Sequence, residues 1–147
     1  MTQVFGDITT LSSDVIINAA NTENVHGGGV DLAITRAAGS LYKQSSNLGR
    51  AVPLGEFLVS PAGKLKAKVI IDIPTIDLVE AKKISLDQLE QVWRSVLVYC
   101  QEHKYKTIAT PLLGAGVVGY TQSQITKLLK KVAHDYADLE VRLVIFR

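Results

Sequence analysis

Residues 15–38 read VIINAANTENVHGGGVDLAITRAA, and this stretch decides the predicted fold. It opens with Val15–Ile17, a run of β-branched residues that predicts a strand buried on both of its faces. It closes with Val30–Ala38, which predicts a helix ending at Gly39, because glycine commonly follows the last helical residue. The glycines Gly27–Gly29 therefore lie where a loop enters a helix.

Strands and helices alternate along the rest of the chain. Capping boxes at Ser85–Gln88 and Thr121–Gln124 each open a segment with apolar residues at helical spacing. The further predicted strands are Thr2–Phe5, Glu56–Ser60, Lys68–Ile73, Thr107–Thr110 and Leu139–Phe146. This alternation predicts an α/β fold with a mixed, largely parallel sheet covered by helices on both faces. No linker or composition break divides the sequence, so we expect one domain over residues 1–147.

The composition excludes several classes of protein. With 47% hydrophobic and 20% charged residues among 147, the chain is typical of one compact domain. The net charge of +2 makes nucleic acid an unlikely partner, so we interpret the cluster Lys64, Lys66 and Lys68 as a solvated surface. Neither a signal peptide nor a membrane span is predicted, and we expect a cytoplasmic monomer that does not bind membranes.

Cysteine and histidine usage argues against disulfides and metal sites. The single cysteine, Cys100, continues the apolar stripe of a predicted helix and is expected to be a packed thiol. The three histidines lie far apart in the sequence. We therefore predict neither a metal site nor a bound cofactor.

Two glycine-rich loops are candidate ligand sites. Gly27–Gly29 follows one predicted strand, and Gly114–Gly119 follows another at Thr107–Thr110. Ligands of open α/β sheets bind beyond the carboxyl ends of strands, and glycine lets the backbone approach a diphosphate closely. Either loop alone is equally consistent with a structural turn. Neither matches the dinucleotide fingerprint or the P-loop, so a nucleoside triphosphate site is not predicted.

Four stretches together resemble the macrodomain family. They are Gly6-Asp7-Ile8-Thr9, Val15–Asn21, His26-Gly27-Gly28-Gly29-Val30-Asp31 and Pro111–Gly116, which occur in the order of the family. Asn21, six further residues and then Gly28-Gly29-Val30-Asp31 look like the hydrolase signature of its MacroD-type branch. The resemblance implies a three-layer α/β/α fold that binds ADP-ribose.

The resemblance also implies roles for individual residues. Asp7 would accept a hydrogen bond from the adenine amino group, Asn21 would hold the distal ribose, and Asp31 would assist catalysis together with Asn21. Asn18 would tie the loop backbone together. Two simpler interpretations stay open: Asp7 caps a turn, and Asp31 only favours the helix dipole. The implied ligand-binding residues are Asp7, Ile8, Asn21, Gly27, Gly28, Gly29, Val30, Gly114, Ala115, Gly116, Val117, Val118, Gly119 and Phe146.

The sequence departs from the family pattern at three places. Val118 stands where the family often has an aromatic residue, and Tyr120, two positions later, is not expected to replace it. Thr35 stands where MacroD-type helices commonly carry histidine. The common His-Thr-Val-Gly-Pro stretch is replaced by Asp72–Ile76.

Three functions follow from the resemblance. The first is hydrolysis of ADP-ribose esters, either mono-ADP-ribose on protein Asp or Glu side chains or O-acetyl-ADP-ribose. The second is a non-catalytic module that binds ADP-ribose and mono-ADP-ribosylated proteins. The third, ranked lowest, is a hydrolase of ADP-ribosylated nucleic acid.

Overall fold

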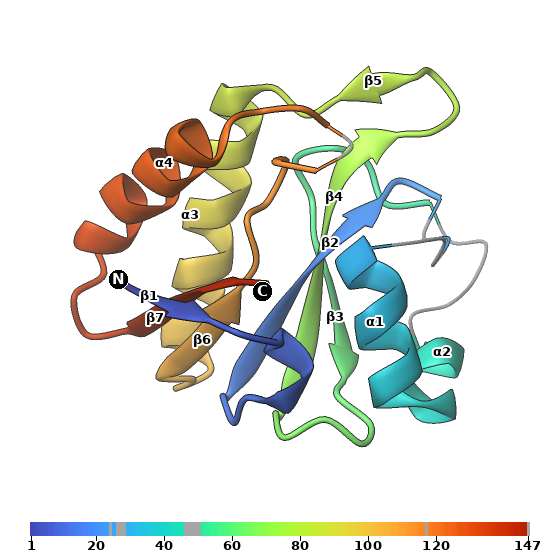
Figure 1. The fold of residues 1–147 in the computed structure, drawn as a ribbon, viewed down its shortest axis with the longest axis vertical. Helices are drawn as coiled ribbons and strands as arrows, with labels where there is room; N and C mark the ends of the chain where they lie inside the picture. The colour runs from blue at the N-terminus through green and yellow to red at the C-terminus, as the bar shows by residue number, and fades with distance from the viewer. Residues whose placement is uncertain (24, 26–28, 46–50, 117, 147) are drawn as a thin grey trace.

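The protein forms one mixed sheet. The computed structural model describes residues 1–23, 25, 29–45, 51–116 and 118–146. Its strands are β1 (Thr2–Phe5), β2 (Val15–Asn21), β3 (Leu58–Pro61), β4 (Val69–Asp77), β5 (Lys82–Lys83), β6 (Thr107–Thr110) and β7 (Glu140–Ile145). They are ordered β1-β7-β6-β2-β4-β3, with β5 also beside β4 (Figure 1). All the pairings are parallel except those of β3 and β5 with β4, as the sequence predicts.

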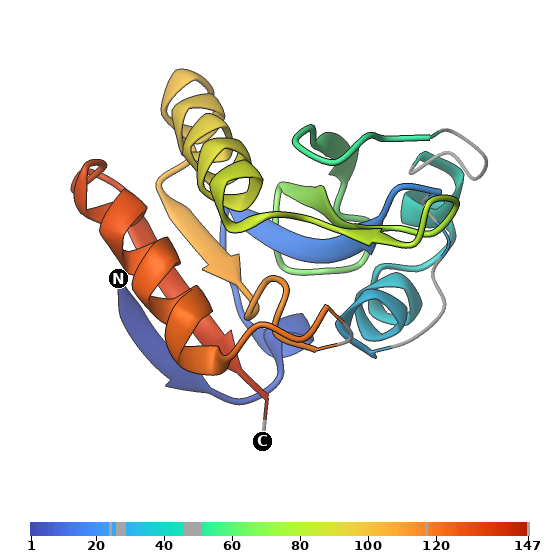
Figure 2. The same ribbon diagram turned by 90° about the horizontal axis from the view of Figure 1, so that it is seen from above.

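Helices cover both faces of the sheet. They are the short 3-10 helix η1 (Ile8–Thr10), α1 (Gly29–Ala38), α2 (Ser40–Ser45), α3 (Leu86–Glu102) and α4 (Gln122–His134). The pair α3 and α4 lies on one face, and α1 and α2 lie on the other (Figures 1 and 2). The predicted three-layer α/β/α architecture is thus confirmed. Among the described helices, none has the length and apolar character that crossing a membrane requires.

Both predicted capping boxes are present. The Ser85 hydroxyl accepts from the Gln88 backbone N–H at 3.1 Å, and the Gln88 side chain accepts from the Ser85 N–H at 3.0 Å. Thr121 and Gln124 make the same reciprocal pair at 3.1 and 2.9 Å. An N-cap of this kind stabilises a helix by about 1 kcal/mol, so each helix start is fixed by its local sequence.

Alternation along β2 divides its side chains between the two layers. Val15 and Ile17 belong to the apolar cluster beneath α3 and α4, whereas Ile16 belongs to the cluster beneath α1 and α2. The next residue toward α1 is Asn18, and its neighbour in the β2–β4 register is Asp72. Two polar side chains are therefore placed side by side on a buried face of the sheet.

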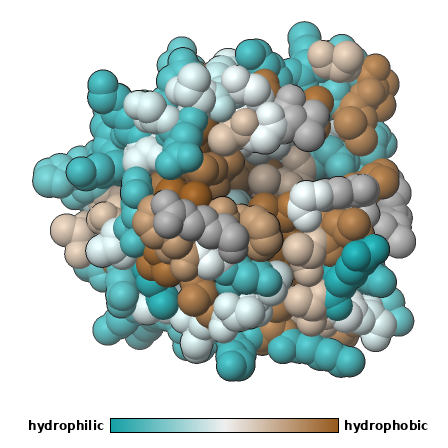
Figure 3. Space-filling model, in the orientation of Figure 1, coloured by the Kyte–Doolittle hydropathy of each residue, from teal (hydrophilic) through white to brown (hydrophobic). Residues whose placement is uncertain are grey.

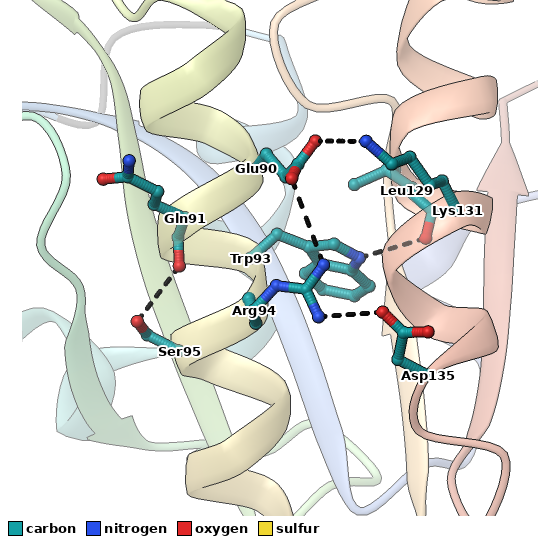
Figure 4. Close-up of polar contacts among 8 residues, drawn as sticks. All are labelled: Glu90, Gln91, Trp93, Arg94, Ser95, Leu129, Lys131 and Asp135. Carbon is teal, nitrogen blue, oxygen red and sulfur yellow. Dashed lines mark hydrogen bonds and ion pairs between the residues drawn. The ribbon is translucent and has the colours of Figure 1, made fainter.

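The layer formed by α3 and α4 is apolar inside and charged outside. Trp93 and Cys100 are fully buried in its core, and burial is the main cause that raises the pKa of the Cys100 thiol to about 12, so the packed thiol is confirmed. The Trp93 Nε1–H donates across to the Leu129 carbonyl at 3.2 Å (Figure 4). Toward solvent, Arg94 pairs with Asp135 at 2.9 Å.

Some boundaries differ from the predictions. Helix α2 and strand β5 are not among the predicted elements, and β3 ends at Pro61, one residue past the predicted end at Ser60. Strand β4 continues through Pro74 to Asp77, past the predicted end at Ile73. Proline lacks a backbone donor and is tolerated at irregularities of a sheet. The β2–β4 register shifts directly after the Ala20–Pro74 pair, so the proline lies where the regular ladder stops.

Candidate functional site

The carboxyl ends of five parallel strands meet at one edge of the sheet. These ends are Phe5, Asn21, Asp77, Thr110 and Ile145. The residues predicted to bind ligand are Asn21, which ends β2, and residues in the segments that follow four of these strands. The structure therefore brings the described members of that set to one edge, although they are spread over the whole sequence.

A crevice is expected between β2 and β6 at this edge. Their pairing covers only Val15–Ile16 with Ile108–Ala109, whereas β2 stays paired with β4 as far as Asn21. The helices that follow the two strands lie on opposite faces of the sheet, α1 after β2 and α4 after β6 (Figure 2). Connections that leave in opposite directions open a crevice, and ligands of α/β proteins bind at such a point.

Asp7 caps η1 at this edge. Its Oδ1 accepts from the Thr9 backbone N–H at 2.9 Å and from the Thr9 hydroxyl at 2.7 Å. The turn-capping interpretation of Asp7 is therefore correct as far as Oδ1 is concerned. The Asp7 side chain is exposed, while Ile8 beside it is buried against the α1 layer.

The second glycine loop folds back on itself after β6. The Tyr120 N–H donates to the Gly114 carbonyl at 3.1 Å, and the Gly119 N–H donates to the Gly116 carbonyl at 3.1 Å. Gly114 has φ of 81°, and a Cβ there would lie 3.2 Å from the Tyr120 ring. Glycine is therefore required at Gly114 both by its backbone conformation and by the close approach of the ring. Val117 lies outside the described residues.

Asn21 holds the first loop together. Its amide donates to the Val25 carbonyl at 2.6 Å, and its Oδ1 accepts from the N–H groups of Glu23 and Val25 at 3.1 Å each. The predicted residues His26, Gly27 and Gly28 lie outside the described residues. Gly29 and Val30 begin α1, so the backbone of this loop leads directly into the helix.

Asp31 belongs to a buried polar cluster, which we define as Asn18, Asp31, Tyr42 and Asp72. The Asn18 amide nitrogen donates to Asp31 Oδ1 at 2.7 Å and to Asp72 Oδ1 at 2.9 Å, and it lies 3.2 Å from the Tyr42 hydroxyl. Tyr42 donates to Asp72 Oδ1 at 2.7 Å. Asp31 is 6% exposed and the other three are at most 1% exposed. The first turn of α1 thus carries a carboxylate that is fixed in position and almost withdrawn from water.

Tyr42 is a permanent hydrogen-bond donor. Burial is the main cause that raises the pKa of its hydroxyl, and the negative charges of Asp72 and Asp31 raise it further. The phenol therefore stays protonated at neutral pH. Its proton is directed at Asp72.

Apolar side chains flank the edge. Phe5 ends β1 and pairs with Ile145 at the end of β7, and Phe146 follows Ile145; the two phenylalanines are 50% and 76% exposed. In Figure 3 apolar atoms gather toward the middle of the face, and hydrophilic atoms dominate its margins. Within the part of the chain that the structure describes, no group of three or more His, Cys, Asp or Glu side chains is arranged to hold a metal ion.

Comparison with known proteins identifies the family. The sequence model described as Macro domain matches residues 17–129. The chain belongs to the macrodomain family. This macrodomain is 36% identical over 135 residues to a protein of Salmonella gallinarum named O-acetyl-ADP-ribose deacetylase, covering 89% of this chain and 75% of that protein.

Solved macrodomains have the same fold. The Oceanobacillus iheyensis macrodomain with ADP superposes with a TM-score of 0.83 at 26% identity, covering 99% of this chain and 82% of that one. The Trypanosoma brucei macrodomain in complex with ADP-ribose gives 0.82 at 25% identity, covering 98% of this chain and 62% of that one. The resemblance inferred from the sequence is therefore confirmed.

Two of the three departures from the family pattern, Thr35 and Asp72, have defined structural roles in this macrodomain, and so does Tyr120 near the third. Tyr120 donates its hydroxyl to the Ile84 carbonyl at 2.7 Å, so its hydrogen bond is made within the protein. Thr35 is buried and donates to the Asp31 carbonyl at 2.7 Å. Asp72 joins the buried polar cluster.

Two members of the cluster are absent from the predicted site residues, and a third was assigned another role. Asn18 was expected to tie the loop backbone, but Asn21 makes those bonds, and the Asn18 amide bonds to the cluster instead. Asp72 and Tyr42 were not predicted at the site. One signal was present, because an aspartate inside the apolar run Ile70–Ile73 predicts a buried polar contact.

Proposed function

We propose that this macrodomain binds ADP-ribose at the carboxyl edge of the sheet and hydrolyses esters on the distal ribose. The substrates are mono-ADP-ribose esters of protein Asp or Glu side chains, or O-acetyl-ADP-ribose. The observation that carries the proposal is the position of Asp31. Its fixed carboxylate follows the first glycine loop at the edge where the second glycine loop and Asp7 also lie. The names of the relatives support the same ligand and the same reaction.

Each end of the ligand has a matching group in the proposal. Asp7 Oδ2 accepts from the adenine amino group, and the Ile8 N–H donates to a ring nitrogen. The backbone of Gly114–Gly119 wraps the diphosphate, while Asn21 and Gly27–Val30 border the distal ribose. Phe146 lies at the same edge with most of its side chain exposed. These contacts give an expected affinity in the micromolar class, about −8 kcal/mol.

Asp31 orients the water that attacks the ester carbonyl; where the ester is at the anomeric carbon and the bond from that carbon to the ester oxygen breaks, Asp31 instead stabilises the positive charge that develops there. The Asn18 amide holds its Oδ1 at 2.7 Å, so the carboxylate does not need to be ordered when substrate binds. General-base catalysis by a positioned group contributes about 10²–10⁴ in rate.

A non-catalytic ADP-ribose reader is the second candidate. The burial of Asp31 favours the reader, because the residue is 6% exposed and little of its surface is available to a water molecule. Asn21 supports it as well, since its amide already bonds to the loop backbone. A reader would bind ADP-ribose and leave the ester intact.

The test compares the parent protein with Asp31→Asn, which keeps the size and shape of the side chain. Calorimetric titration with ADP-ribose measures binding, and release of acetate from O-acetyl-ADP-ribose or of ADP-ribose from a Glu-modified protein measures turnover. We expect the variant to keep its affinity and to lose about 10²–10⁴ in kcat.

The other outcomes separate the alternatives. Binding without turnover in the parent protein identifies a reader. If Asp31→Asn hydrolyses the ester as fast as the parent protein does, the Asp31 carboxylate is not catalytic. Its role is then structural, with a helix-dipole contribution of about 0.3–1 kcal/mol to stability. Absence of heat and of thermal stabilisation at millimolar ADP-ribose contradicts the proposal as a whole.

A further inference from the structure

The Asn18 amide is oriented by two carboxylates. Its nitrogen lies 2.7 Å from Asp31 Oδ1 and 2.9 Å from Asp72 Oδ1, and both of these atoms can only accept when ionised. Turning the amide over would direct its carbonyl oxygen at both carboxylates, which is repulsive. In the observed orientation the Asn18 carbonyl oxygen is buried and has no hydrogen-bond partner among the described residues. The two donated bonds therefore outweigh an unmade one.

Tyr42 helps to fix the Asp72 oxygen that accepts from the Asn18 amide. The tyrosine hydroxyl and the Asn18 amide both donate to the same oxygen, Asp72 Oδ1, at 2.7 and 2.9 Å. Two donors from different elements fix that oxygen more closely than one donor would. Because Asn18 and Asp72 are partners in the β2–β4 register, the strands already hold their backbones side by side. Tyr42, from α2, provides a further constraint on the Asp72 side chain.

From this arrangement, we propose that Tyr42 and Asp72 are positioning residues for Asp31. They lock the Asn18 side chain so that its amide nitrogen, and not its oxygen, faces the Asp31 carboxylate. This inference rests on the proposed function of Asp31. It goes beyond that function because it assigns a task to α2 and to the aspartate of β4, where the family commonly has histidine.

The burial of Asn18, Tyr42 and Asp72 distinguishes a positioning role from a role in ligand binding. Asn18, Tyr42 and Asp72 are at most 1% exposed, so a ligand at the edge does not touch them. Changes at Tyr42 and Asp72 should therefore act on kcat through the geometry of Asp31 and leave KM unchanged. A misplacement of about 1 Å can cost about 10²-fold in rate.

The experiment uses three variants and one control. Tyr42→Phe removes only the hydroxyl. Asp72→Leu removes the acceptor, whereas Asp72→Asn keeps an acceptor oxygen for Asn18 and Tyr42. The control, Tyr99→Phe, removes a tyrosine hydroxyl from α3 on the opposite face. For each, kcat and KM for O-acetyl-ADP-ribose, the Kd for ADP-ribose and the melting temperature are measured.

We expect kcat to fall about 10-fold in Tyr42→Phe and by up to about 100-fold in Asp72→Leu, with KM and Kd unchanged. Asp72→Asn should retain most of the parental kcat, and Tyr99→Phe all of it. Parental kcat in Tyr42→Phe would overturn the inference. So would an Asp72→Asn variant as impaired as Asp72→Leu, because charge and not the acceptor would then matter. Where Asp72→Leu does not fold, Tyr42→Phe decides.

A second readout does not depend on turnover. The side-chain amide protons of Asn18 give nitrogen-correlated NMR signals that report their hydrogen bonds. These signals should shift in Tyr42→Phe and stay in place in Tyr99→Phe, and unchanged signals in Tyr42→Phe would overturn the inference. A parent protein without turnover would contradict the hydrolase proposal alone, and the NMR comparison would still decide the orientation of Asn18.

Discussion

Helices α3 and α4 cover one face of the sheet with apolar side chains, whereas α1 and α2 cover the other with a smaller apolar cluster and the buried polar cluster. On the first face the charged groups Glu90, Arg94, Lys131 and Asp135 lie at the solvent side of the helices (Figure 4). On the second face Asn18, Asp31, Tyr42 and Asp72 lie between helix and sheet. Both layers consist of two helices packed on the sheet, but the polar groups lie on the solvent side of one layer and between helix and sheet in the other.

The difference indicates which layer carries stability and which carries function. Burying a polar group costs free energy even when hydrogen bonds recover most of it, so an apolar cluster is the more efficient way to hold a sheet. The layer beside the candidate site nevertheless contains two carboxylates at most 6% exposed. We infer that substitutions under α3 and α4 change the free energy of unfolding, and that substitutions near α1 and η1 change binding and turnover.

The largest effect is expected for Trp93→Ala. The side chain is fully buried, and its indole N–H bonds to the Leu129 carbonyl at 3.2 Å. Truncating a buried tryptophan lowers the free energy of unfolding by about 3–5 kcal/mol. Urea unfolding followed by circular dichroism measures this, because the variant loses the only tryptophan of the chain. A folded variant with weakened ADP-ribose binding would break the division between the layers.

Asp7→Ala tests the other side of the comparison. Losing a hydrogen bond to a charged group should weaken ADP-ribose binding by about 1.5–3 kcal/mol, and selectivity for adenine over hypoxanthine analogues should fall. Asp7 also caps η1 through Oδ1, so Asp7→Ser, which keeps a capping oxygen, is the matched control. Calorimetry on both variants separates the roles. If Asp7→Ala binds ADP-ribose as tightly as the parent protein does, Asp7 serves only as a turn cap.

A smaller, pH-dependent effect is expected for Asp14→Asn, at the amino edge of the sheet. Hydrogen bonds from the backbone N–H of Lys106 lower the pKa of the Asp14 carboxyl most, and those from Thr107 and the charge of Lys68 lower it further, against the opposing effect of burial. Because the pKa is lower in the folded protein than in the unfolded chain, the ionised carboxyl stabilises the fold at pH values above the unfolded pKa of about 3.9. This stabilisation is lost as the pH falls through the folded pKa.

Denaturation at two pH values checks the sign for Asp14. We expect Asp14→Asn to cost about 1–2 kcal/mol near pH 7, since it replaces charge-assisted bonds by neutral ones. The difference from the parent should begin to shrink below about pH 4, where the carboxyl of the unfolded parent becomes protonated, and should shrink further as pH falls through the lower pKa of the folded parent. A difference that grows on acidification would contradict the lowered pKa.

The smallest effect belongs to Arg94→Ala on the outer side of α3. Arg94 pairs with Asp135 at 2.9 Å and with Glu90 at 4.0 Å, but its side chain is 37% exposed. Exposed ion pairs stabilise by about 0.2–1 kcal/mol, and salt screens them. Unfolding in low and high salt should show a small cost that diminishes with salt. A loss as large as that of Trp93→Ala would show that this layer depends on its charges.

The local sequence predicts the helix starts well and the polar cluster poorly. The capping boxes at Ser85 and Thr121 depend on residues three apart, so the pattern alone finds them. The Asn18–Asp72 pair depends on the register of two strands separated by more than 40 residues, which no local pattern contains. Tyr42 reaches the cluster from α2, whose six residues are too few to show helical periodicity.

The parallel pairing of β1 with β7 has a consequence for handling the protein. Because the two strands run in the same direction, Thr2 pairs with Arg142 at one edge of the sheet, and Phe5 pairs with Ile145 at the edge that carries the candidate site. A tag or surface anchor attached before β1 therefore leaves from the far side of the molecule. The same anchor attached after β7 leaves beside Phe146, on the side that carries the candidate site. Immobilisation through the amino end is therefore the orientation that leaves the candidate site facing away from the surface.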